Sequence, residues 1–152
     1  KAATELHKNG KDVCFCIAGE PYTDWEPYQR IIDASPAPER FYTYLKFIPK
    51  EDVHVFFSAA DLVCLPYAAA SQSGVTAIAM HYHKPVVATD VGGLKEYFDG
   101  NPIGHICAPR DVHALTEAIR SALSAEPVEA ASIATWNARF SWAAFAQQCL
   151  SA

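Results

Sequence analysis

The sequence of 152 residues lacks clustered basic residues. Its 12 Lys and Arg are outnumbered by 17 Asp and Glu, which gives a formal net charge of -5. Binding to nucleic-acid phosphates requires Lys and Arg gathered on one face, so the composition excludes non-specific binding to DNA or RNA. An anionic ligand would have to be held by local structure instead.

Also lacking are an apolar stretch of the roughly 20 residues that span a bilayer and an N-terminal secretion signal. The sequence opens on Lys1 without a methionine. We therefore expect a fragment of a longer protein that resides in the cytoplasm.

No pair of cysteines has the C-x-x-C spacing of metal or redox sites. The number of cysteines is odd, and most of them lie in apolar runs, where a thiol packs as a small hydrophobic group. We expect a reducing compartment and a packing role for these residues, which are Cys14, Cys16, Cys64, Cys107 and Cys149.

There is no internal repeat and no Gly/Ser linker, so residues 1–152 are expected to form one domain. Short apolar runs alternate with longer helical patterns, which is typical of an α/β fold with a doubly wound parallel sheet and flanking helices. Strands are expected at residues 13–18, 40–45, 62–66, 85–89 and 105–108, each covered on both faces. Helices are expected at 2–8, 25–34, 50–60, 74–82, 94–98 and 112–123. In the tail, 127–152, two short helices are expected to pack through Trp136, Phe140, Trp142 and Phe145.

Residues 61–96 are the most informative segment, because two strands are each followed by a turn of small residues. The turn Ser71-Gln72-Ser73-Gly74 precedes a helix whose free N–H groups would suit a phosphate. Ordinary helix capping by serine is the alternative explanation. Ligands of such sheets bind beyond the carboxyl ends of the strands.

Several motifs occur in a fixed order: Ile17-Ala18-Gly19, Phe47-Ile48-Pro49, residues 60–67, residues 84–96 (KPVVATDVGGLKE) and Phe140-Ser141-Trp142. Together they resemble the C-terminal, nucleotide-sugar-binding lobe of GT-B fold retaining glycosyltransferases, known as group 1 or family 4. The resemblance implies a hexosyltransferase that uses a nucleotide-diphosphate sugar as donor and needs no metal ion or other cofactor. It also implies that this fragment is inactive without the missing N-terminal lobe.

The resemblance also implies site residues. The base is expected at Ile48 and Pro49, and the diphosphate at Ser71, Ser73, Gly74 and Val75. Ile78, Gly92, Gly93 and Glu96 are expected near the ribose or the sugar.

At two positions the sequence departs from the family pattern. The usual pair of glutamates, eight residues apart, is replaced by Ala70 and Ile78. Neither side chain can accept hydrogen bonds from ribose or stabilise a cationic transition state. A subset of the family is similar, with Ser-Gly-Val in this turn.

Other polar side chains have simpler explanations. For Glu96, which the resemblance places near the ribose or the sugar, a solvated helix carboxylate is the alternative explanation, and Asp90 could hydrogen-bond the Gly92-Gly93 turn. His81 and His83 are two residues apart on an expected helix and do not face each other, so a metal site is not expected.

A full lobe of this family starts with one further strand, which would be central in the sheet. We expect this first strand to be missing, which leaves two inner edges exposed. The leading hypothesis is a glycosyltransferase with an unknown acceptor: a polysaccharide, a lipid-linked sugar or a small molecule. The alternatives are a catalytically degenerate lobe used for nucleotide binding or assembly, and another GT-B enzyme such as a sugar-nucleotide epimerase. The missing lobe could also attach the enzyme to the cytoplasmic face of the membrane.

Overall fold

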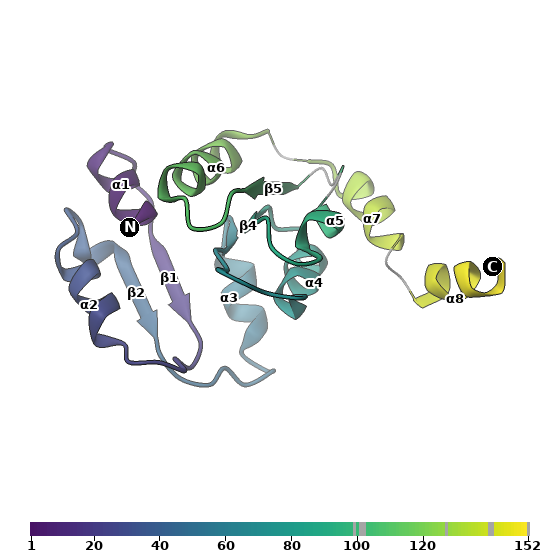
Figure 1. Cartoon of the computed structure of the whole chain (residues 1–152), viewed down its shortest axis with the longest axis horizontal. Coiled ribbons are helices and arrows are strands. Elements are labelled where there is room, and N and C mark those ends of the chain that lie inside the picture. The colour runs from purple at the N-terminus through teal and green to yellow at the C-terminus, as the bar shows by residue number, and fades with distance from the viewer. Residues whose placement is uncertain (99, 101–102, 127, 140–141, 152) are drawn as a thin grey trace.

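The computed structural model describes residues 1–98, 100, 103–126, 128–139 and 142–151. Helices and strands alternate through most of the chain (Figure 1). In order, they are α1 (Ala2–Lys8), β1 (Phe15–Ala18), α2 (Glu26–Asp33), the 3-10 turn η1 (Pro38–Arg40), β2 (Phe41–Tyr44), α3 (Val53–Ala59), β3 (Val63–Leu65), α4 (Gly74–His81), β4 (Val86–Thr89), α5 (Leu94–Phe98), β5 (Gly104–Cys107), α6 (Val112–Ser124), α7 (Ala130–Ala138) and α8 (Trp142–Ser151).

All five expected strands are present. The first four are one or two residues shorter than expected, because ladder pairing covers only part of each apolar run, and β5 has the expected length but begins one residue earlier. Helices α1 and α5 have the expected bounds. Helix α3 begins three residues later than expected, since the Asp52 N–H bonds to the Pro49 carbonyl in a turn. The two expected tail helices are α7 and α8. Of their aromatic residues, Trp136 is buried. Phe140 and the side chains of Trp142 and Phe145 lie outside the described residues.

The strands form two parallel sheets, β1-β2 and β3-β4-β5, which stand apart in Figure 1. No described strand pairs with the inner edge of β1 or with that of β3. This is the division expected for a doubly wound sheet that lacks its first strand.

The core lies on the two faces of β4, whose four residues are all buried. Because side chains alternate along a strand, Val87 points to one face while Val86 and Ala88 point to the other. Val87 packs with α1 and α6 in a cluster that also holds Leu6, Cys107 and Ile119. Val86 and Ala88 pack with α4, α5 and α7 in a cluster that includes Met80, Leu94, Phe98, Ile133 and Trp136. Helices therefore cover both faces, as predicted.

Helix α1 holds the two sheets together. It lies against α6 (Figure 1), and the Thr116 hydroxyl donates to the Glu5 carboxylate at 3.2 Å. Phe15 of β1 and Cys64 of β3 both pack against the core cluster that this helix shares with α6. None of the helices in the described part of the chain is long and apolar enough to cross a bilayer.

The prediction that every strand is covered on both faces was wrong for β1, where three of four residues are exposed, and for β2, where two of four are exposed. With no strand beside the inner edge of β1, Cys16 and Ile17 face solvent. The packing role expected for the cysteines holds for Cys107, which is buried, and for Cys64, which is half-buried. Burial raises the pKa of the Cys64 thiol to about 12. Cys14, Cys16 and Cys149 are exposed instead.

Candidate active site

The amino end of α4 lies directly beyond β3 and is open. Ser73 is its N-cap residue, in an extended conformation (φ -140°), but its hydroxyl caps nothing. It forms a hydrogen bond with the Tyr67 hydroxyl at 3.0 Å. Among the described residues, no side chain accepts from the N–H groups of Gly74 or Val75. The simple capping explanation for these serines therefore does not describe the structure.

Helix α6, unlike α4, has a side-chain hydrogen bond at its amino end. Its N-cap residue, Asp111, accepts a hydrogen bond from the Ala114 N–H at 2.9 Å. The first N–H groups of a helix need such partners from a side chain, water or a ligand. At α6 the protein supplies the partner, whereas at α4 the donors are left for another group.

The surroundings of these donors favour an anion. Residues 62–89 contain no Asp or Glu, although the whole chain has 17. A Cβ added at Gly74 would meet nothing within 4 Å, so the space in front of the helix is free. Two residues after Gly74, Thr76 is only 2% exposed, and its hydroxyl has no hydrogen-bond partner within the described part of the chain. The positive end of the α4 dipole faces this space.

The turn after β4 is locked against the turn after β3. The Gly93 N–H donates to the Ser71 carbonyl at 3.0 Å. Gly92 has φ +54°, and a Cβ there would lie 1.9 Å from the Ala70 carbonyl oxygen. Gly92 and Gly93 are expected near the ribose or the sugar, but the close approach that requires glycine at position 92 is to Ala70. Ser71, Gly92 and Gly93 are thus brought together.

The remaining predicted residues lie around this pair of turns or away from it. Glu96 is exposed on α5, and Ile78 is half-buried on α4. Ile48 and Pro49 are half-buried after β2, which belongs to the other sheet. Their roles remain predictions. Asp90, which was expected to support the turn, forms an ion pair with Lys95.

Two residues that order the site were missed by sequence reasoning. Tyr67 holds the Ser73 hydroxyl, and Thr89 at the end of β4 donates to the Tyr67 carbonyl at 2.7 Å. The second contact joins the ends of neighbouring strands. No spacing in the sequence signals it, because it depends on how β3 and β4 pair.

No group of three or more His, Cys, Asp or Glu converges in the described ranges. His81 and His83 are both exposed, and His83 lies beyond the end of α4 with φ 54°. Independence from metal stays a prediction.

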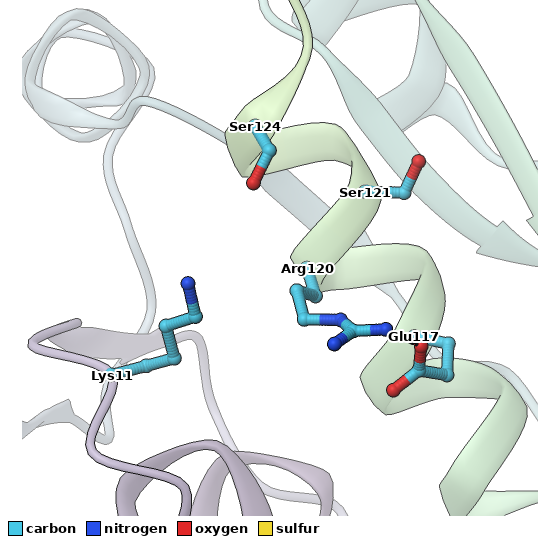
Figure 2. A pocket seen from close by; sticks show the side chains of 5 residues that line it. All are labelled: Lys11, Glu117, Arg120, Ser121 and Ser124. Atoms are coloured by element: carbon cyan, nitrogen blue, oxygen red, sulfur yellow. Dashed lines mark hydrogen bonds and ion pairs between the residues drawn. The ribbon is translucent and has the colours of Figure 1, made fainter.

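A surface groove of about 490 Å³ lies elsewhere. Figure 2 shows Lys11, from the loop before β1, facing α6 across this groove. Arg120 on the far wall already pairs with Glu117, and the groove runs to Ser124 at the carboxyl end of α6. The negative end of a helix dipole disfavours anions. The groove is also at the amino edge of the strands, opposite to α4's open end.

Comparison with known proteins gives the family. The sequence profile described as "Glycosyl transferases group 1" matches residues 1–125. A comparison with curated protein sequences found no significant match.

Solved structures that share the fold include three glycosyltransferase-related proteins. The sucrose-phosphate synthase of Thermosynechococcus elongatus is similar with a TM-score of 0.75 and 21% identity, over 99% of this chain and 40% of that one. HepE of Anabaena, solved in complex with UDP, is similar with a TM-score of 0.73 and 19% identity, over 99% of this chain and 43% of that one. A glycosyltransferase of Rickettsia africae is similar with a TM-score of 0.70 and 17% identity, over 99% of this chain and 41% of that one.

The chain thus spans about two fifths of each of these proteins. Their likeness confirms the predicted fold, that of the C-terminal lobe of a GT-B glycosyltransferase. The profile match covers well over half of the sequence. The chain belongs to the glycosyl transferases group 1 family.

Proposed function

We propose that this chain is the donor-binding part of a glycosyltransferase and that the diphosphate of a nucleotide sugar binds at the amino end of α4. The observation that carries this proposal is the open helix end, where the Gly74 and Val75 N–H groups have no acceptor in the described part of the chain. Backbone donors and the helix dipole together make an anion site.

The same donors would assist the reaction. When the bond from the sugar to the diphosphate breaks, negative charge develops on the leaving phosphate oxygens. Fixed N–H groups stabilise that charge without having to reorganise, which is the usual basis of electrostatic catalysis. The bond between Tyr67 and Ser73 keeps this end of the helix in place.

The rest of the donor is assigned by the family resemblance. We expect the base near Ile48 and Pro49 and the sugar near Gly92, Gly93 and Glu96. Ile78 occupies the position where the family usually has a ribose-binding carboxylate, so the ribose has to be held by other groups. We expect hexose transfer without a metal ion, onto an acceptor bound by the remainder of a longer enzyme.

Titration calorimetry of the full-length protein with UDP, ADP and GDP tests the proposal. We expect at least one diphosphate to bind more tightly than about 1 mM, which corresponds to about -4 kcal/mol. The matching monophosphate should bind more weakly, because it lacks the second phosphate. If no diphosphate binds in this range, the donor-binding proposal fails.

A catalytically degenerate lobe is the second candidate, favoured by Ala70 and Ile78 in place of the two carboxylates. It predicts nucleotide binding without turnover. Release of nucleoside diphosphate from a panel of nucleotide sugars, with and without candidate acceptors, distinguishes it from the enzyme.

A further inference from the structure

Lys95 is the cation of the α4–β4–α5 segment that follows the carboxyl end of a strand, the edge of the sheet at which the candidate site lies. Between residues 62 and 98 the basic side chains are Lys84 and Lys95. Lys84 precedes β4, at the amino edge, where its ammonium donates to the Ser58 carbonyl at 3.2 Å. Lys95 follows the Gly92-Gly93 turn at the opposite edge.

The locked turns place Lys95 beside the loop that leads into α4. Gly93, two residues before it, is bonded through its N–H to the Ser71 carbonyl. Ser71 is in turn two residues from Ser73, the N-cap residue of α4. The base of the Lys95 side chain is therefore tied to the anion site through backbone contacts, while its four-carbon stem can move.

In this structure the Lys95 ammonium is held by Asp90, with Nζ and Oδ2 3.4 Å apart. Both side chains are well exposed, at 68% and 41%. Solvent-exposed ion pairs contribute little, so this pair is easily exchanged. A diphosphate carries at least two negative charges against one on Asp90, and it offers the ammonium the stronger partner.

We propose that Lys95 is a diphosphate-binding residue that exchanges Asp90 for the phosphate oxygens when the donor binds. This inference rests on the proposed function and adds a cation to a site otherwise built from backbone donors. The released Asp90 carboxylate then limits the affinity, because it competes with the ligand for the same ammonium.

Inorganic pyrophosphate is the probe of choice, since its binding does not depend on the base or the sugar. With the full-length protein at low salt, Lys95→Gln should weaken binding about tenfold, the effect of losing one charge-assisted hydrogen bond. Lys95→Arg should retain most of the affinity. The matched control is Lys11→Gln, which removes the same charge at the amino edge and should leave binding unchanged.

Asp90→Asn gives the sharper result. Removing the competing carboxylate should tighten pyrophosphate binding about threefold at low salt, and the gain should shrink as salt screens the charges. A residue with a purely structural role would not produce tighter binding when changed. If the Asp90→Asn variant binds pyrophosphate more weakly than the unaltered protein does, Lys95 does not exchange Asp90 for the phosphate oxygens.

The outcomes separate this inference from the proposed function. If neither pyrophosphate nor any nucleoside diphosphate binds the unaltered protein, both fail. If they bind, and Lys95→Gln behaves like Lys11→Gln, then Lys95 is not a ligand residue and only this inference is overturned. Thermal melting of each variant checks that the fold is retained.

Discussion

Replacing Gly92 by alanine is expected to lower the free energy of unfolding by about 3 kcal/mol or more. The new Cβ would lie 1.9 Å from the Ala70 carbonyl oxygen and 2.9 Å from that of Ser71. Both are backbone atoms, so a whole turn has to move. The left-handed conformation, φ +54°, adds strain for any residue with a side chain. Urea unfolding measures the change.

Two neighbouring glycines are the controls. At Gly93 a Cβ would lie 3.4 Å from the Ser71 oxygen, an ordinary contact, so Gly93→Ala should cost well under about 1 kcal/mol. Gly100 shares the positive φ, at +69°, but its nearest neighbour is the Trp136 ring at 3.5 Å. Gly100→Ala therefore measures the strain alone. If Gly92→Ala is no more destabilising than Gly100→Ala, the two turns are not locked as described.

Gly74→Asp is expected to abolish donor binding while leaving the fold intact. A carboxylate at the first residue of α4 would repel the diphosphate at close range, and binding should weaken at least a hundredfold. The same charge at a helix amino end stabilises the helix by about 0.3 to 1 kcal/mol. Space for the side chain is available, since nothing lies within 4 Å of the Cβ position.

Gly74→Ala is the matched variant, because it adds a side chain without charge. Calorimetry with the tightest nucleoside diphosphate, together with thermal melting, should show a large loss of affinity for Gly74→Asp and a small one for Gly74→Ala. If the Gly74→Asp variant bound the nucleoside diphosphate with unaltered affinity, the diphosphate would have to lie elsewhere on the molecule.

The elements of the fold were predictable where the signal is local. The apolar run before the Gly92-Gly93 turn gave β4 to within one residue, because a strand covered on both faces has no polar alternation. The absence of a described strand between β1 and β3 was predictable from the order of the family motifs. The exposure of Cys16 was not predictable, since an apolar strand looks the same in sequence whether or not a neighbour covers it.

The candidate site was predictable in part. Ser73 and Gly74 form a helix start that sequence reasoning could locate, and the structure leaves that start uncapped. The contact of Gly92 with Ala70 was not foreseen, because it joins turns 22 residues apart in the sequence. The same holds for the hydrogen bond from Thr89 to Tyr67. Both depend on the register of β3 against β4, whereas the pair of Asp90 and Lys95 forms within the turn after β4.

The central claim is that the nucleotide diphosphate lies at the open end of α4, and mapping its binding by backbone amide NMR tests this claim most directly. Titration of the labelled full-length protein with the tightest nucleoside diphosphate should shift the amide signals of Ser73, Gly74 and Val75 first. Those of Gly92 and Gly93 should follow. Shifts confined to the groove of Lys11 and Arg120, with Gly74 unmoved, would contradict the account.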